Sequence, residues 1–278
     1  MFYARHKEFP QVERDKQGQV RPSLMNNPAP SGLSSKLRVV FMQKHHEAER
    51  DNERNILRLL EPDPNAALLD LGCANGSWTM HVARRVGTTK IHGIELDLAS
   101  ARASAERGIN VAIADLSHGF PFSDDSIDVI HSNQVIEHLI DVDNFVAETH
   151  RVLEVSGYAI ISTENLSSVE NLISLALGQQ AFSQHISRRF HVGNVFSPHF
   201  GEEVTREEMV HRTVFAFFGL RQLLEAYGFV VERTLGAGYS PFPNRLALVD
   251  HVHARFITMK VTKASKCKRP ALACPHLT

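Results

Sequence analysis

Cysteine is scarce in this sequence, with three residues among 278, at positions 73, 267 and 274. Folds held together by disulfides need several paired cysteines, so a disulfide framework is excluded and a reducing, cytoplasmic setting is expected. Long apolar runs are also missing, because no stretch approaches the roughly 18 consecutive apolar residues that span a bilayer. The first eight residues mix charged and polar side chains, which is not the pattern of a secretory signal. We therefore expect no transmembrane segment.

No charge of one sign dominates the chain. Lysine and arginine number 30 against 31 acidic residues, which gives a formal net charge of −1. Proteins that grip nucleic acid non-specifically are usually strongly basic, so no nucleic-acid partner is expected. Hydrophobic residues at 43% and charged residues at 22% are ordinary globular values. A chain of this length can bury one large core, or one core and a small appendage.

Metal-binding motifs with familiar spacing are absent as well. Cys267, Cys274 and His276 do not match a zinc finger, and a fourth ligand is missing. Sixteen histidines are present, and four of them lie in or beside residues 165–213: His185, His191, His199 and His211. None of these four forms an i, i+4 pair, so solvated or hydrogen-bonded loop histidines are expected and no metal site is predicted. A base or a metal ligand among them stays open as the alternative.

The chain does contain a regular alternation of short apolar runs and helical segments. The runs that predict strands are 67–71, 90–96, 110–114, 127–131, 158–162, 229–235 and 254–261. The segments that predict helices are 34–61, 77–86, 97–108, 141–153, 169–177 and 215–227. Repeated strand–helix units of this length predict a parallel sheet with helices on both faces. The last strand is expected at an edge of the sheet.

The domain boundaries follow from where this rhythm begins and ends. Residues 1–33 hold several prolines among Ser, Asn and Gly, which predicts an irregular N-terminal arm. Residues 34–262 form one domain, and residues 263–278 a flexible C-terminal tail. Residues 165–213 break the alternation, and an insertion of this length is uncommon unless it has a function or is disordered.

The strongest local signal is Leu69-Asp70-Leu71-Gly72-Cys73-Ala74-Asn75-Gly76-Ser77, between the first strand and the following helix. Small residues allow a sharp turn there and a close approach of a ligand to the main chain. A dinucleotide fold would need glycine at positions 74 and 77, where the sequence has Ala74 and Ser77. An acid at Asp70 suits a cationic amino group and would repel a pyrophosphate, so a nicotinamide oxidoreductase is disfavoured.

The spacing instead resembles the D-x-G-x-G-x-G motif of class I S-adenosylmethionine (SAM)-dependent methyltransferases, with Ala74 at the middle glycine. The likeness continues through Ile91–Asp97, Ala114–Leu116, Phe120–Ile130, Ser132–Leu139 and Arg151–Gly157. It is strong over residues 55–165 and weaker over 205–262, where the chain is similar to small-molecule members of the quinone-biosynthesis type. The resemblance implies a doubly wound, Rossmann-like, mostly parallel seven-stranded α/β sheet with an insertion after the fifth strand.

The resemblance also implies how the cofactor SAM would be held. Its methionine end would lie against Asp70, Gly72, Ala74 and Gly76. Glu95, followed by Leu96, would hold the ribose hydroxyls, because a carboxylate forms strong charge-assisted hydrogen bonds. Asp115 and Leu116 would meet the adenine, and Asn133 and Gln134 would lie near the sulfonium. The product would be S-adenosylhomocysteine (SAH).

Methyl transfer from a sulfonium needs mainly the in-line alignment of donor and acceptor, and positioning can lower the barrier by about 7–11 kcal/mol. A general base is optional, and His138 is the candidate, although it could equally cap the next helix or orient Glu137. We expect O-methylation of a small molecule, apolar or aromatic if residues 165–213 cover the acceptor side. The apolar run Leu172–Leu177 within that insertion fits such a cover or ordinary core packing. A protein or RNA methyltransferase and a non-catalytic SAM-binding protein remain alternatives.

Overall fold

The computed structural model describes residues 33–205 and 210–264. Nearly all of the predicted N-terminal arm and tail, with Cys267, Cys274 and His276, therefore lies outside the described residues. Seven strands form one sheet in the order β3-β2-β1-β4-β5-β7-β6. Strands β1 to β5 run parallel, and β7 is antiparallel to both β5 and β6. The predicted mostly parallel, seven-stranded doubly wound sheet is confirmed.

The strand bounds lie within a few residues of those predicted, except for β5. The strands are β1 (Ala67–Leu71), β2 (Lys90–Glu95), β3 (Asn110–Ile113), β4 (Ile127–Asn133), β5 (Leu153–Glu164), β6 (Phe229–Ala237) and β7 (Phe256–Lys263). Strand β5 begins at residue 153, directly after the helix that ends at Val152, whereas the sequence predicted its start at residue 158. The expectation that the last strand lies at an edge is wrong, because β7 lies between β5 and β6. Six consecutive residues of β7 are buried, as in a strand covered on both faces.

The helices are α1 (Leu33–Leu59), α2 (Ser77–Val86), α3 (Leu98–Ala105), α4 (Val142–Val152), α5 (Val169–Ala176) and α6 (Phe217–Ala226), with short 3-10 turns η2 (Ile136–His138) and η4 (Asn244–Leu248). Asp97 and Asp141 cap α3 and α4, each accepting from the backbone N–H three residues on. No helix among the described residues has the length and apolar character to cross a membrane.

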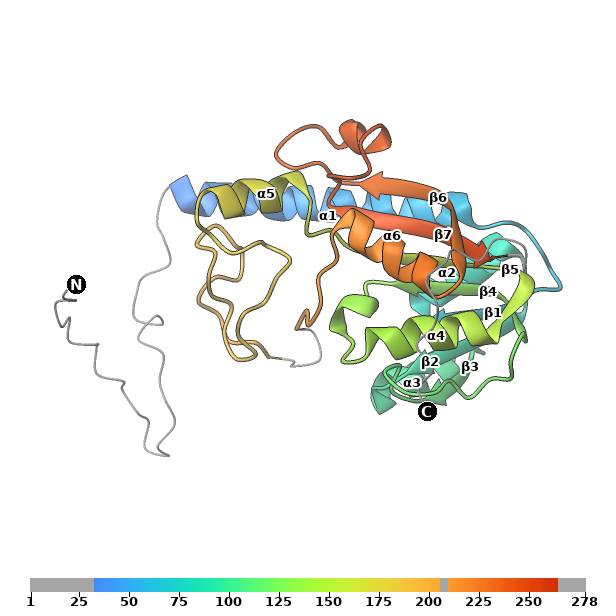
Figure 1. Ribbon diagram of the computed structural model, residues 1–278. Helices are drawn as coiled ribbons and strands as arrows, with labels where there is room; N and C mark the ends of the chain where they lie inside the picture. The colour runs from blue at the N-terminus through green and yellow to red at the C-terminus, as the bar shows by residue number, and fades with distance from the viewer. Residues whose placement is uncertain (1–32, 206–209, 265–278) are drawn as a thin grey trace, which may run out of the picture.

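Two apolar cores lie on opposite faces of the sheet. One contains α4 and α6 side chains with Leu69, Ile130 and Ile161. The other contains α1 and α2 side chains, including Ile56 and Val82, against Leu68 and Ile160. Figure 1 shows α4 and α6 in front of the sheet and α1 behind β6 and β7. The strand order reverses between β1 and β4. In doubly wound sheets, ligands bind at the carboxyl ends of the strands at this point.

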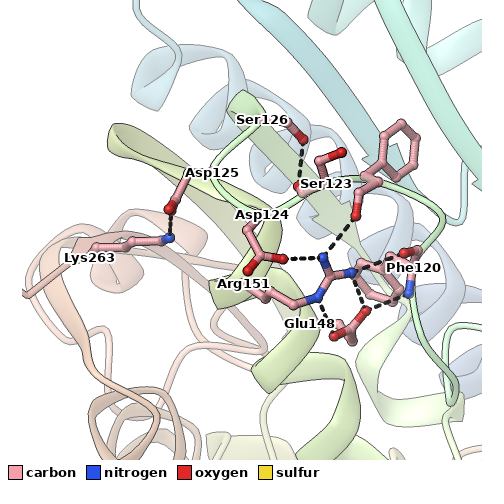
Figure 2. A network of polar contacts seen from close by, with 9 residues as sticks. Phe120, Ser123, Asp124, Asp125, Ser126, Glu148, Arg151 and Lys263 are labelled. Atoms are coloured by element: carbon pink, nitrogen blue, oxygen red, sulfur yellow. Dashed lines mark hydrogen bonds and ion pairs between the residues drawn. The ribbon is translucent and has the colours of Figure 1, made fainter.

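A single arginine fixes the segment that leads into β4. Arg151, in the last turn of α4, donates to the carbonyl oxygens of Phe120 and Phe122 and to the carboxylates of Asp124 and Glu148, at 2.6–3.0 Å (Figure 2). The same Glu148 accepts from the N–H of Phe120 at 2.6 Å. The network holds the loop before β4, and β4 carries Asn133 at its far end.

Helix α5 in the insertion presents its apolar side chains outward. Leu172, Ile173, Leu175 and Leu177 are 41–62% exposed. The buried residues of the helix are Glu170, Asn171 and Ser174. Asn171 donates to Ser183 at 2.7 Å and accepts from the N–H of Phe182 at 2.8 Å. The interpretation of this apolar run as ordinary core packing is therefore wrong, because hydrogen bonds rather than apolar contacts hold the inner side of α5.

Candidate functional site

The turn after β1 is built from three left-handed residues. Gly72, Ala74 and Gly76 have φ angles of 76°, 46° and 77°. A Cβ at Gly72 would lie 2.7 Å from Val135 Cγ2, and one at Gly76 would lie 2.6 Å from Ser104 Oγ. The two glycines are therefore required by space as well as by conformation, whereas Ala74 carries the strain of a left-handed residue with a side chain. Gly76 caps α2 and has no side chain that could accept from the first turn of the helix, where the N–H of Ser77 donates to the side-chain oxygen of Asn75 at 3.1 Å.

Glu95, at the end of β2, faces this turn. One carboxylate oxygen accepts from the N–H of Ala74 at 2.8 Å, and the other accepts from the N–H groups of Leu96 and Asp97 at 2.9 and 2.8 Å. A carboxylate has about four acceptor positions, and the side chain is only partly buried. About one acceptor position therefore remains, which suffices for one ribose hydroxyl, and the predicted hold on both hydroxyls stays a prediction. The next side chain, Leu96, is 59% exposed.

Asp70 lies behind the turn rather than on its surface. Its carboxylate accepts from Thr79 Oγ1 at 2.5 Å and pairs with His131 Nδ1 at 2.6 Å, and its side chain is 4% exposed. The indole N–H of Trp78 donates to the other nitrogen of His131 at 3.3 Å. The carboxylate thus joins β1 and β4 to the first turn of α2. Its direct contact with a ligand stays a prediction, since both oxygens already have partners.

Asn133 and Gln134 close the site from the end of β4. Gln134 is a left-handed residue with φ of 55°, and its buried side-chain nitrogen has no hydrogen-bond partner among the described residues. Strained backbone and an unpaired buried donor both cluster at ligand sites. A cavity of about 370 Å³ opens here, lined by His46, Glu49, Arg50, Asn52, Glu53, Asn133, Gln134 and Phe256. The unpaired amide can therefore serve an acceptor group of a ligand in this cavity.

The opposite wall is formed by α1, for which the sequence predicted a helix but no part in the site. Asn52 is 3% exposed, donates to Asn133 at 3.0 Å, and accepts from Ser162 at 3.0 Å and Thr258 at 2.7 Å. A second cavity of about 660 Å³ continues along the helix, lined by Arg50, Glu53, Arg54, Leu57, Ser77, Trp78 and His81. Residues 43–55 of this helix are almost all polar or charged, and this run is the signal in the sequence that could have indicated a polar surface opposite it.

The predicted adenine residues lie just past β3, at the same edge of the sheet. Asp115 accepts from the N–H of Ser117 at 2.8 Å and faces His118 at 3.5 Å. Leu116 is 7% exposed and packs in the core, so only its backbone can face a ligand. The parallel strands β1, β2, β3 and β4 end at this edge, which brings the segments that carry Gly72, Glu95, Asp115 and Gln134 to one side of the sheet.

His138 lies in η2, four residues beyond Gln134, and does not cap α4 because Asp141 does so. Its ring centroid is 4.8 Å from that of His211, which is 4.9 Å from that of His185. Burial lowers the pKa of His138 to about 4, so its imidazole is neutral at pH 7. The prediction that the insertion's histidines are hydrogen-bonded is confirmed for three of them: His185 accepts from the N–H of His211, His211 Nδ1 meets the carbonyl oxygen of Ser183, and His199 pairs with Glu202. His211 packs against the predicted catalytic residue His138, and His185 packs against His211.

Known proteins resemble this chain over most of the described sheet. A methyltransferase-domain family matches residues 44–234. A probable S-adenosylmethionine-dependent methyltransferase of Mycolicibacterium smegmatis is 31% identical over 176 residues, which cover 61% of this chain and 54% of that protein. A ubiquinone biosynthesis O-methyltransferase of Bartonella quintana is 29% identical over 119 residues, covering 38% of this chain and 44% of that protein. The chain spans about half the length of these two relatives.

Among solved structures, a SAM-dependent methyltransferase from Mesorhizobium loti superposes with a TM-score of 0.51. It is 16% identical in sequence, and the match covers 77% of this chain and 97% of that chain. At this identity the likeness concerns the fold alone.

Proposed function

Because this chain belongs to the class I SAM-dependent methyltransferases, we propose that it transfers the methyl group of SAM to an oxygen atom of a small-molecule acceptor. The observation that carries the proposal is the convergence of the left-handed turn at residues 72–76 with Glu95 and Gln134 at the carboxyl edge of the sheet. When bound there, SAM supplies a methyl group bonded to a sulfonium sulfur, and the neutral thioether SAH is a good leaving group.

The proposed placement assigns each part of the edge one role. Gly72, Ala74 and Gly76 line the methionine end, behind which Asp70 holds the turn in shape. Glu95 accepts from the ribose hydroxyls and Leu96 packs beside it. Asp115, with the backbone of Leu116, meets the adenine. The side-chain amides of Asn133 and Gln134 lie beside the sulfonium end, where Gln134 has a free donor.

Positioning is the main contribution of the protein in this proposal. Asn52 fixes Asn133, and Arg151 fixes the loop that leads into β4, so the residues beside the sulfonium stand on rigid supports. His138 is neutral and can accept a hydrogen bond from an acceptor hydroxyl. With a pKa of about 4 it is a weak base. We therefore assign it the orientation of the acceptor rather than the bulk of the rate.

The acceptor class rests on two further observations. The formal charge of −1 gives no basic surplus for a nucleic acid. The insertion, residues 165–213, places His211 against His138 and His185 against His211, and we infer from this that the insertion covers the acceptor side. The Bartonella relative is named as an O-methyltransferase of a small-molecule pathway, which agrees with this class.

The test is incubation of the protein with SAM that carries a deuterated methyl group, in separate reactions with a small-molecule extract, total RNA and a protein lysate. We expect the label in a small molecule, on an oxygen that NMR identifies, and a strong reduction with Glu95→Gln. Label found in RNA or protein alone would assign a macromolecular acceptor instead. No transfer to any fraction by protein that binds SAM would favour a non-catalytic SAM-binding protein.

A further inference from the structure

Glu137, His138 and His211 form a cluster of possible metal ligands beside the proposed acceptor side. Glu137 is fully buried, and neither of its carboxylate oxygens makes a hydrogen bond of good geometry among the described residues, although the buried and otherwise unpaired hydroxyl of Thr163 interacts with it. An ionised carboxylate buried without a partner is costly, so in native proteins such a group takes up a proton, is paired, or coordinates a metal. One ligand atom each from Glu137, His138 and His211 lies within 4.8 Å of the other two.

The backbone holds these three residues together across the insertion. The carbonyl oxygen of Glu137 accepts from the N–H of Arg212 at 2.7 Å and from that of Thr213 at 3.1 Å. These two bonds tie η2, which follows β4, to the segment that ends the insertion. His211 is thereby fixed opposite Glu137 and His138, although the residues are far apart in the sequence.

Hydrogen bonds also orient the two imidazoles. His211 Nδ1 lies 2.6 Å from the carbonyl oxygen of Ser183, and His138 Nδ1 lies 3.4 Å from that of Val210. A carbonyl only accepts, so each Nδ1 carries its proton and each Nε2 keeps a free lone pair. Metal-binding histidines characteristically donate their other N–H to a carbonyl or carboxylate. Glu164 lies 3.7 Å from His211 Nδ1 and adds a carboxylate to this outer layer.

His185 is excluded from the ligand set by the same reasoning. Its Nδ1 accepts from the backbone N–H of His211 at 3.0 Å, so its proton is on Nε2. Its ring packs against His211 and forms part of the wall.

We propose that Glu137, His138 and His211 form a binding site for one divalent transition-metal ion of the zinc class. Two imidazoles and one carboxylate suit zinc, iron or cobalt, whereas magnesium and calcium prefer oxygen ligands alone. Bonds of about 2.0–2.2 Å place tetrahedral ligands about 3.4 Å apart, so binding would draw ligand atoms now up to 4.8 Å apart closer by as much as about 1.4 Å. Three protein ligands leave a coordination position open, as at catalytic rather than structural zinc sites.

The use of this open position rests on the proposed function, whereas the site itself does not. In a small-molecule O-methyltransferase, an ion there would hold an acceptor oxygen and favour its deprotonated form. The ion would then supply the activation, and His138 would serve as its ligand instead of accepting a hydrogen bond from the acceptor hydroxyl, because Nε2 has only one lone pair.

The test is titration of chelator-treated protein with Zn²⁺ in a calorimeter, and with Co²⁺ followed by visible absorption, without SAM or acceptor. We expect one ion per chain and a Co²⁺ spectrum typical of nitrogen and oxygen ligands. Loss of even an outer partner typically weakens metal binding about 10–100-fold, so Glu137→Gln and His211→Gln should each weaken it at least that much.

The matched control is His199→Gln, because His199 lies in the same insertion, pairs with Glu202 and is half-exposed. This variant should bind Zn²⁺ as the unchanged protein does. His138→Gln gives an independent test should one of the other variants fail to fold. Absence of Zn²⁺ binding by folded protein, or binding that survives all three ligand substitutions, would overturn the metal site. The same samples are also titrated with SAM. Protein that binds SAM but not Zn²⁺ would refute the metal site and leave the proposed methyl transfer standing.

Discussion

Replacement of Gly76 by alanine should lower the free energy of unfolding by about 2–5 kcal/mol. The left-handed φ of 77° costs an alanine about 1–2 kcal/mol. The new Cβ would lie 2.6 Å from Ser104 Oγ and 2.7 Å from Ile109 Cδ1, both on buried residues. Overpacking of this kind typically costs about 1–3 kcal/mol. The measurement is urea denaturation followed by circular dichroism, with an unchanged slope showing that only stability has changed.

Ala74→Gly is the matched control in the same turn. It removes about 1–2 kcal/mol of left-handed strain, and the added freedom of the unfolded chain offsets about 0.4–1 kcal/mol of that gain. The free energy of unfolding should therefore stay constant or rise by up to about 1.5 kcal/mol. A loss below about 1 kcal/mol for Gly76→Ala, or a clear destabilisation by Ala74→Gly, would refute the geometry assigned to the turn.

Three further changes test the supports of the site. Burial raises the pKa of the Cys73 thiol to about 11. In a Cys267→Ser, Cys274→Ser variant, where Cys73 is the one remaining thiol, alkylation of the folded protein at pH 8 should therefore be at least about 100-fold slower than alkylation of the urea-unfolded protein. The rate for the folded protein should increase as the pH rises toward 11. Arg151→Ala should lower the free energy of unfolding by about 1–3 kcal/mol, because several charge-assisted hydrogen bonds are lost from a partly exposed side chain. Arg151→Lys should be more stable than Arg151→Ala but less stable than the unchanged protein in the same denaturation assay. Asn52→Ala should lower the free energy of unfolding by a similar amount. It should also weaken SAM binding measured by calorimetry, because Asn133 loses its hydrogen-bond partner. An unchanged affinity for SAM would show that Asn52 does not position Asn133 for the cofactor.

The order of strands and helices could be predicted because short apolar runs and capping residues are local signals. Asp97 and Asp141 cap the helices that their positions predict. The place of β7 could not be predicted, because a strand's neighbours depend on pairing across the whole sheet. Helix α5 misled the prediction because Asn171 and its partners replace the apolar contacts that an apolar run normally makes.

The local shape of the proposed site was predictable where one segment determines its own conformation, whereas the roles of its residues stay predictions. The turn at residues 72–76 is such a segment, and so is the acid that ends β2. Partners contributed by distant segments were not predictable, since nothing local marks them. His131 beside Asp70 is one example, and Asn52 beside Asn133 is another. The meeting of His138 and His211 likewise depends on how the insertion folds back onto η2.

The most direct test of the account is calorimetric titration with SAM and SAH of the unchanged protein, of Glu95→Gln and of Glu106→Gln, whose exposed acid at the end of α3 serves as control. We predict that both ligands bind the unchanged protein and the control alike. Glu95→Gln should bind both at least about 10-fold more weakly, because hydrogen bonds to a charged group contribute about 1.5–3 kcal/mol. Equal affinity of Glu95→Gln and the unchanged protein, or no binding of either ligand by folded protein, would contradict the proposed site.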